Sequence, residues 1–501
     1  MFYCGVTIRK LLPAGIIFSA AVLFWISRNA YYVGFFNDDA FFIIGARSLL
    51  QGRFVELNQP GFPPLMEYSP GYPFLLAPLV FLFPFSTLPY QIFSIFLSVM
   101  SLVLYWFFLK DQISYTAAIV CVALAAFNPL TASLSGQVLS DIPYLLFSLA
   151  TIEVCRRVWT SEDRRAWFFV AFLSGLSYCI RPIGAGLGFS ICLVLVFERR
   201  WRTLGYFAFC LVALAAPFAV SPTLRKLEEI RSSNSGGFSQ AVFFENAFRN
   251  GAYYLNEIFI RNLFRWWMDS AFLKGTTILF SLVLLAVGLR RFGRSGWEKA
   301  LLVYLLFYAL VHLSFWSKQS GRYVYPIFPF LLFFIFAAID HPSLKLPFRQ
   351  YAILGVAAII LSCYGGPLIK IAQASQYPRS VLTRPPKTYE WIRSHTNASD
   401  IFVTELDGRF FIYTGRQVYR LPKIFDVQEL LSWLSVRKVG YLLVDEAPFM
   451  MKTNQGNTPH DPYPYQQLLN TIRNHRTFQK VYEESQAGHA LYRVVQSKVN
   501  P

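Results

Sequence analysis

Charged residues are scarce in this sequence. Only 15% of its 501 residues are Asp, Glu, Lys or Arg, whereas a soluble domain carries about a quarter. Hydrophobic residues make up 55%, and apolar runs long enough to cross a bilayer recur along the first three quarters of the chain. A soluble protein is therefore excluded, and the composition indicates an integral membrane protein.

Cysteine is also sparse, and no two cysteines form a CxxC pair. Six of the seven lie in or beside apolar runs, Cys4 lies near the N-terminus, and the C-terminal tail has none. We therefore expect neither a structural disulfide nor a cysteine metal site. The sequence also lacks internal repeats and low-complexity tracts, so solenoid folds are not expected.

Acidic residues are the scarcer kind of charge. The chain has 28 of them against 46 Lys and Arg, which gives a net charge of +18. A basic chain can bind nucleic acid, but here most basic residues form short clusters between apolar runs, as the positive-inside rule expects. The expected partner is therefore the lipid bilayer, and no nucleic acid is expected.

About eleven stretches satisfy the length criterion of roughly 20 apolar residues for a transmembrane helix. They are 11–27, 89–109, 114–132, 140–157, 166–182, 184–198, 203–221, 275–290, 299–317, 322–340 and 350–366. The further apolar stretch 72–85 is short and contains three prolines. We interpret it as an interfacial or re-entrant segment.

The basic clusters predict the orientation of the chain. If 72–85 does not cross, one face receives Arg9/Lys10, Lys110, Arg156/Arg157/Arg164/Arg165, Arg199/Arg200/Arg202, Arg290/Arg291/Arg294/Lys299 and Lys345/Arg349. That face is expected to be cytoplasmic, as is the N-terminus, with an uncleaved first anchor. The long segments 28–88, 222–274 and 367–501 then lie on the other side, and we expect a multi-pass protein of a bacterial inner (plasma) membrane.

The C-terminal tail has a different pattern from the rest. Helix-like stretches at 389–394, 427–436 and 465–474 alternate with strand-like stretches at 401–404, 439–445, 478–483 and 489–495. Such alternation predicts a small α/β domain. The expected fold is thus an α-helical polytopic membrane domain over 1–366, followed by an extracytoplasmic α/β domain over 367–501.

The segment 222–274 contains a second recognisable pattern. Apolar residues recur at helical spacing from Phe248 to Trp266, with Arg249, Arg261 and Arg265 between them. This pattern suits an amphipathic helix lying in the membrane interface. A plain packing helix explains it equally well.

Acidic residues stand at the external ends of two predicted spans. Asp38 and Asp39 follow the first span, and Asp141 begins the fourth. Each could simply cap a helix N-terminus. Carboxylates beside a bilayer nevertheless cost free energy unless they are solvated, paired or functional.

Three basic residues break the charge bias, because Arg181, Lys318 and Arg322 fall on the predicted external face. Each could be snorkelling toward the interface. Arginine is also the preferred bidentate partner of phosphate. External carboxylates together with external arginines suggest a site for a sugar phosphate, in which we expect the two kinds of side chain to converge.

The order of these features resembles the GT-C superfamily of glycosyltransferases, in particular the protein mannosyltransferase and aminoarabinose transferase branch. The residues that carry the resemblance run along the chain as 36–41 (FNDDAF) with Ala46 and Arg47, 68–73 (YSPGYP), 139–143 (LSDIP), Gly175 to Arg181-Pro182, and Arg322-Tyr323 with Pro326 and Pro329.

The resemblance implies a polyprenyl-phosphate-linked sugar donor and inversion at the anomeric carbon. It implies Asp38 and Asp39 as the catalytic residues, with Asp38 at the position of the base. The family's other acidic and basic positions map to Asp141, Arg181 and Arg322. We expect these three residues, together with Lys318, Tyr323 and Tyr68, to bind the substrate. Members of the superfamily often have Asp-Glu in place of Asp38-Asp39, and some have a lysine before the Pro-containing turn, where this chain has Tyr68-Ser69.

Several alternatives stay open. Some members bind a divalent metal near the acidic residues, but no ligand set is evident here and we predict none. A lipid or sugar transporter or flippase, a non-catalytic subunit of a glycan assembly complex, and an oligosaccharide ligase with a diphosphate-linked donor are the competing functions. The acceptor could be a glycan, a lipid or a protein.

Overall fold

The computed structural model describes residues 2–219, 240–264, 270–314, 321–340, 349–376, 385–422, 424, 426–445 and 472–495. The chain divides into two compact units. The first, here called the helical unit, comprises Met1–Ala30, Ser69–Tyr72 and Phe85–Gln376. The second, the α/β unit, comprises Tyr31–Tyr68, Pro73–Pro84 and Tyr377–Pro501.

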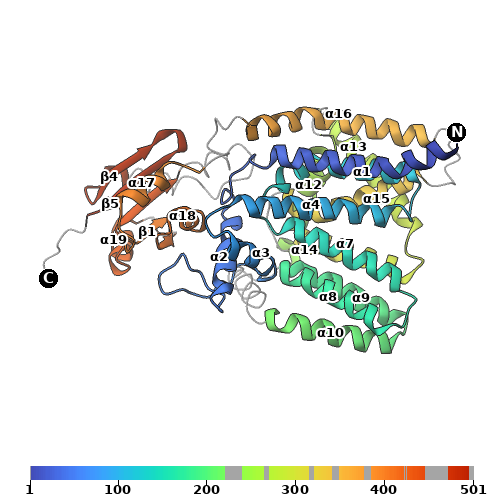
Figure 1. The fold of residues 1–501 in the computed structure, drawn as a ribbon, viewed down its shortest axis with the longest axis horizontal. Helices are drawn as coiled ribbons and strands as arrows, with labels where there is room; N and C mark the ends of the chain where they lie inside the picture. The colour runs from blue at the N-terminus through green and yellow to red at the C-terminus, as the bar shows by residue number, and fades with distance from the viewer. Residues whose placement is uncertain are drawn as a thin grey trace. The chain divides into compact units, whose positions relative to one another are not determined.

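The helical unit is built from the apolar stretches, and every predicted span overlaps a helix. Its elements are α1 (Phe2–Ser27), α4 (Leu88–Leu109), α5 (Tyr115–Ala126), α6 (Pro129–Ser135), α7 (Asp141–Val158), α8 (Arg164–Ile180), η1 (Pro182–Gly184), α9 (Ala185–Phe197), α10 (Trp201–Ala219), α12 (Gln240–Leu255), η2 (Asn256–Arg261), α13 (Ala271–Arg291), α14 (Gly296–Ser314), η3 (Gly321–Ile327), α15 (Phe328–Ile339) and α16 (Arg349–Gln376). Helices α1, α4, α7, α8 and α10 run side by side in Figure 1.

The number of spans is smaller by a strict criterion than the sequence predicted. Within the described residues, five helices are long and apolar enough to cross a membrane, and a sixth span results if α5 and α6, which meet at 55°, count as one. The count of eleven is therefore not confirmed. Several of the other predicted spans are apolar but short in the described residues, namely Leu11–Ser27, Pro182–Phe197 and Trp201–Leu214. Helix α8 has 17 residues with two arginines in its first turn, and α7 contains four charged residues.

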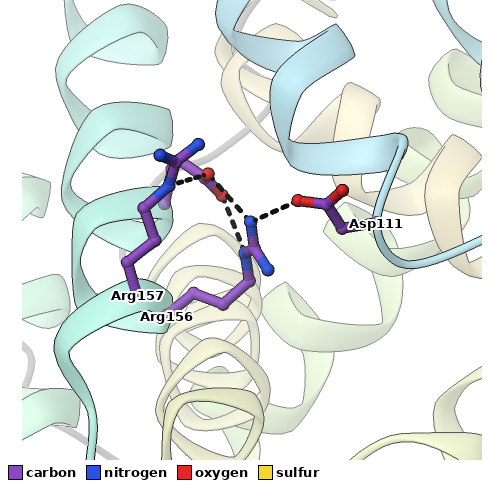
Figure 2. A network of polar contacts seen from close by, with 4 residues as sticks. Asp111, Arg156 and Arg157 are labelled. Carbon is purple, nitrogen blue, oxygen red and sulfur yellow. Dashed lines mark hydrogen bonds and ion pairs between the residues drawn. The ribbon is translucent and has the colours of Figure 1, made fainter.

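Ion pairs bind the last turn of α7, where one of the predicted basic clusters lies. Arg156 donates to Asp111 at 3.0 Å and to Glu153 at 2.8 Å, and Arg157 donates to Glu153 at 2.6 Å. Figure 2 shows Arg156 and Asp111 facing each other. The two guanidinium groups balance the negative charge of the buried Glu153 carboxylate. The ion pair with Asp111 connects α7 to the turn after α4.

The α/β unit contains a five-stranded sheet in the order β2-β1-β3-β5-β4. Its strands are β1 (Phe402–Thr404), β2 (Val418–Arg420), β3 (Tyr441–Asp445), β4 (Phe478–Glu484) and β5 (His489–Val494). Strand β1 pairs in parallel with β2 and β3, whereas β5 is antiparallel to β3 and β4. Figure 1 shows β4 and β5 as the red strands of this sheet.

Three helices pack on that sheet: α17 (Thr388–His395), α18 (Asp407–Thr414) and α19 (Val427–Val436). Leu430 and Leu434 of α19 lie in one hydrophobic cluster, while Ile392 of α17 and Phe410 of α18 lie in another. The helices predicted at 389–394 and 427–436 and the four predicted strands are confirmed. Helix α18 and strand β2 were not predicted, and the helix predicted at 465–474 lies mostly outside the described residues.

Helix α2 (Asp38–Leu50) and all but the first two residues of helix α3 (Gly71–Leu82) precede the tail in the α/β unit. Helix α2 packs through Phe41 and Ile44 against Leu57 and Leu65 of the following loop. Helix α3 has 12 residues with Pro78 inside, so it is about 18 Å long. A helix of this length is too short to cross a bilayer alone, and the interfacial placement of 72–85 stays a prediction.

Helix α12 and the π-helical turn η2 occupy the region of the predicted amphipathic pattern. Phe248 is 83% exposed, whereas Phe259 and Leu263 are buried. The apolar residues of the predicted pattern are therefore exposed at Phe248 in α12 and buried at Phe259 and Leu263 in and after η2. Arg265 and Trp266 lie outside the described residues.

Candidate active site

Asp38 begins helix α2, and its carboxylate is held by a tyrosine from the following loop. The hydroxyl of Tyr68 donates to Asp38 Oδ1 at 3.0 Å. The Tyr68 ring stacks on Phe41 with 4.9 Å between centroids. Burial, followed by the charge of Asp38, raises the pKa of Tyr68 well above its usual value. Tyr68 therefore stays a protonated donor and fixes the half-buried carboxylate of Asp38.

Asp39 lies in a different environment from its neighbour. It is fully buried, and its carboxylate accepts the backbone N–H groups of Gly34 and of Ala40. Burial, together with the charge of Asp38, raises the pKa of Asp39 to about 7. These contacts use Asp39 to close the turn before α2, although the N-cap position of α2 is Asn37 and its side chain makes no cap to that helix.

Asp141 and Arg181 form a buried ion pair in the helical unit. Asp141 lies in the first turn of α7, where the helix dipole favours a carboxylate. Arg181 follows the last residue of α8 in an extended conformation, and its guanidinium pairs with the Asp141 carboxylate. The side chains are 2% and 13% exposed, respectively, so each charge depends on the other.

Arg322 and Tyr323 join this pair. The guanidinium carbons of Arg181 and Arg322 lie 5.0 and 5.1 Å from the centre of the Tyr323 ring, within the range of cation–π contacts. Arg322 also donates to the Tyr323 hydroxyl at 3.2 Å. Two cationic side chains from distant parts of the sequence thus flank one aromatic ring. We call Asp141, Arg181, Arg322 and Tyr323 the arginine cluster.

Two buried residues of helix α14 support the arginine cluster. The Tyr308 hydroxyl donates to the backbone carbonyl of Tyr323 at 2.5 Å, and His312 stacks on Tyr308 with 4.3 Å between centroids. Neither residue is predicted from the sequence. Both lie inside an apolar span, and only tertiary packing shows that the Tyr308 hydroxyl faces the cluster, while His312 Nδ1 bonds to the Tyr308 carbonyl of its own helix.

Glu257 is a further residue that sequence reasoning missed. It lies in η2, is buried, and pairs with Arg261 at 2.8 Å. A Cβ atom on Gly321 would come within 2.2 Å of Glu257 Oε2, so a side chain immediately before Arg322 would displace the Glu257 carboxylate. Lys318, the remaining predicted cation, lies outside the described residues.

Other acidic residues of the α/β unit interact with Tyr68 or with one another. Burial, followed by the charges of Asp407 and Glu67, raises the pKa of Glu56 to about 7. Burial also raises the pKa of Asp407 to about 6, against the opposing charge of Arg420. In the part of the chain that the structure describes, no three His, Cys, Asp or Glu residues gather as a metal-binding group.

Solved structures resemble the chain over nearly its whole length. The crystal structure of ArnT from Cupriavidus metallidurans in the apo state matches with a TM-score of 0.61 and 11% identity, over 97% of this chain and 98% of that one. The ArnT structure bound to undecaprenyl phosphate gives a TM-score of 0.57, also at 11% identity, over 97% and 99% of the two chains. The chain has the GT-C fold.

The archaeal oligosaccharyltransferase AglB from Archaeoglobus fulgidus, in complex with an inhibitory peptide and a dolichol-phosphate, shares this GT-C fold. It matches with a TM-score of 0.54 and 12% identity, over 99% of this chain and 75% of that one. At such low identities the likeness is one of fold. The GT-C resemblance drawn from the order of sequence motifs is therefore confirmed.

A sequence-family model adds a local match. The model of the dolichyl-phosphate-mannose-protein mannosyltransferases matches residues 67–225. That part of the GT-C fold contains Tyr68, Asp141 and Arg181, whereas Asp38 and Arg322 lie outside it. Among proteins with a curated function, none matches the chain significantly.

Proposed function

We propose that this protein is a membrane glycosyltransferase that moves a sugar from a polyprenyl-phosphate carrier to an acceptor on the extracytoplasmic side. The fold is shared with ArnT, solved with undecaprenyl phosphate, and with AglB, solved with dolichol-phosphate. Both ligands are polyprenyl monophosphates. The local match to dolichyl-phosphate-mannose-protein mannosyltransferases supports the same class of donor.

The arginine cluster is the observation that carries the proposal. Arg181 and Arg322 lie at the ends of apolar helices, and Asp141, Tyr323 and Tyr308 hold them in place. Preorganised guanidinium groups bind phosphate in bidentate geometry and stabilise the negative charge that develops on a leaving phosphate. We therefore assign Arg181 and Arg322 to the phosphate of the carrier.

Asp38 is the proposed general base. In the reaction, an acceptor oxygen or nitrogen attacks the anomeric carbon, the bond from that carbon to the phosphate oxygen breaks, and the acceptor proton passes to Asp38. Attack opposite to the leaving phosphate inverts the anomeric carbon. The Tyr68 hydrogen bond orients the carboxylate, and a positioned base contributes typically 10²–10⁴-fold to the rate.

The remaining predicted residues receive supporting roles. The contacts of Asp39 with Gly34 and Ala40 favour a role in shaping the turn that presents Asp38. The ion pair with Arg181 favours a role for Asp141 in orienting that guanidinium. Tyr323 would hold both arginines apart at a fixed distance, and Lys318 is proposed as an additional phosphate ligand.

The variant Asp38→Asn tests the assignment of the base. Membrane glycolipids, polysaccharides and glycoproteins are compared by mass spectrometry in cells with the gene, without it, and with each variant. We expect a glycosylated product to disappear without the gene and to fall at least 100-fold with Asp38→Asn, since an amide cannot accept the proton. Glu390→Gln, an exposed residue of α17, is the matched control and should keep the product.

The same comparison can refute the proposal. A full amount of product from Asp38→Asn, at equal protein level, would remove Asp38 as the base. Binding of polyprenyl monophosphate and diphosphate to purified protein then separates a monophosphate-dependent transferase from a diphosphate-dependent ligase. We expect the monophosphate to bind, and Arg322→Gln to weaken that binding at least tenfold because one cationic partner of the phosphate is lost.

A further inference from the structure

The side chain of Asn37 caps a helix of the C-terminal sheet rather than its own helix. Asn37 precedes α2 but makes no side-chain cap to it. Its Oδ1 instead accepts the backbone N–H of Arg409, at 2.9 Å, in the first turn of α18. Leu406, at the N-cap position of α18, provides no cap of its own. Asn37 therefore satisfies an N–H group that a helix start leaves without a partner.

Asp407 extends this contact. Its Oδ1 accepts Asn37 Nδ2 at 3.4 Å, and its Oδ2 accepts Asn58 Nδ2 at 3.0 Å. The backbone carbonyl of Asn58 also accepts the backbone N–H of Val418, which begins β2, at 2.8 Å. All three side chains are buried. Asn37, before α2, and Asn58, after it, are thus both bound to the carboxylate of Asp407 in the C-terminal tail.

Arg409 makes a third connection between the same segments. Its guanidinium donates to the Tyr32 hydroxyl at 2.7 Å and pairs with Asp445 of β3. Tyr413, one turn further along α18, donates to the Val33 carbonyl at 2.5 Å. The loop before Asp38 is therefore bound to the centre of the sheet and not only to its surface.

A series of direct contacts connects α18 to Asp38 through Phe41 and Tyr68. A Cβ atom on Gly408 would lie 2.8 Å from the Phe41 ring and 3.0 Å from Asn37 Oδ1. The Phe41 ring stacks on Tyr68, and Tyr68 donates to Asp38. Interiors packed this closely transmit displacements. A shift of α18 would therefore move the ring that supports Tyr68.

The backbone at Asn37 indicates that these contacts hold a particular conformation. Its φ is +64°, in the left-handed region that residues other than glycine and asparagine seldom adopt. The residue next to it is the proposed base. A strained residue beside a functional group persists only where the surroundings determine its conformation, and here those surroundings belong to α18.

We propose that the C-terminal α/β domain sets the position of Asp38, and that Asn37 and Gly408 are the positioning residues through which it acts. The inference rests on the proposed role of Asp38. It gives the C-terminal domain a part in the reaction, namely to hold the base in the orientation in which it accepts the acceptor proton. A misplaced base costs rate even when the donor still binds.

Two variants and a matched control test the inference. Asn37→Gly keeps the positive φ accessible and removes both side-chain hydrogen bonds. Gly408→Ala places a methyl group against Phe41 and Asn37. Gly440→Ala is the control in the same domain, since its new Cβ would have only the Ile401 carbonyl oxygen nearby, at 3.9 Å. Each is assayed with the donor whose product is identified by mass spectrometry, beside wild type and Asp38→Asn.

We expect kcat per folded molecule to fall at least tenfold in Asn37→Gly and in Gly408→Ala, with KM for the donor within about twofold of wild type. Gly440→Ala should keep both parameters. An unchanged kcat in either variant would overturn the inference, even if the unfolding temperature fell, because the contacts would then be structural only. If Asp38→Asn itself stayed active, the proposed function would fail instead.

Discussion

At the scale of single residues, two adjacent aspartates have separate environments. Asp38 is half-buried and bonded to the Tyr68 hydroxyl, whereas Asp39 is fully buried and bonded to backbone N–H groups. The sequence predicts both as candidates because it shows only that two carboxylates are adjacent. Neighbouring side chains at a helix start point in different directions, and this separates a candidate base from a structural residue.

The raised pKa of Asp39 predicts a pH-dependent stability. Its pKa of about 7 lies above the ordinary value of 3.8, so the folded state binds a proton that the unfolded state has released. Stability from this group is therefore highest at low pH and falls as pH rises through 7. Between pH 5.5 and 7 the loss is about 2 kcal/mol, at 1.36 kcal/mol per pH unit.

The variant Asp39→Asn removes this titration. Its destabilisation relative to wild type should be about 2 kcal/mol smaller at pH 8.5 than at pH 5.5, since only wild type then loses stability by ionising. Unfolding midpoints of the purified protein at the two pH values measure the difference. Equal destabilisation at both pH values would show that Asp39 titrates in its normal range.

Some of the residues that meet in the structure were predicted from the sequence, and others had no local pattern that could identify them. Asp141, Arg181 and Arg322 were predicted on one face, and they come together around Tyr323. Asn37, Asp407 and Glu257 were not predicted. Each is a common polar residue in a loop or helix, and its importance comes from burial beside a partner that is distant in the chain.

At the scale of elements, the C-terminal end of α8 fixes Arg181 through glycine contacts. A Cβ on Gly71 would lie 2.5 Å from the backbone carbon of Cys179, and one on Gly184 would lie 2.6 Å from that of Ser177. Both distances are too short for any side chain. The start of α3 and the turn η1 can therefore approach α8 only because these positions have no Cβ.

This geometry predicts that Gly71→Ala displaces the end of α8. Overpacking of this kind typically costs 1–3 kcal/mol, and the displaced Arg181 should lower polyprenyl monophosphate affinity at least fivefold. Gly175→Ala is the control in the same helix, because its nearest contact would be Leu214 at an ordinary 3.5 Å. That change should keep the affinity and add up to about 1 kcal/mol of helix stability.

Thermal unfolding and lipid-binding measurements on both variants check this prediction. If Gly71→Ala binds the lipid as tightly as wild type while Gly175→Ala weakens binding, the end of α8 does not determine the position of Arg181. Loss of stability without loss of affinity would likewise separate the packing of α3 from the proposed phosphate site.

Elements were predictable where their signal is local. Apolar runs gave helices at every predicted span, and short alternating stretches gave four strands of the sheet. Helix α18 was missed because it has only eight residues and its N-cap, Leu406, is not a capping residue. The cap comes from Asn37, which is 372 residues away from its partner, so no local pattern could indicate it.

At the scale of the whole molecule, the chain is not divided where its composition changes. Residues 31–68 and 73–84 belong to the same compact unit as the C-terminal tail. The first loop and the tail had been predicted as separate external segments. Their common unit contains the proposed base, while the arginine cluster belongs to the helical unit.

The basic clusters predict how the whole protein lies in its membrane. Asn397→Cys, an exposed position before β1, should react with a membrane-impermeant maleimide in intact spheroplasts. Arg294→Cys, an exposed position between α13 and α14, should react only after lysis. The reason is that cationic loops are retained on the cytoplasmic side. The opposite labelling pattern would invert the topology and place the proposed reaction in the cytoplasm.

The sequence by itself determined the class of the protein, the positions of its helices, and most of a C-terminal α/β fold, because hydrophobic periodicity and chain length act locally. Only the tertiary structure decided which charges meet. Asp141 and Arg181 are 40 residues apart, and Asn37 and Asp407 are 370 apart. Pairs at such separations form because tertiary packing brings the two residues together and removes water around them. Local sequence patterns do not predict that packing.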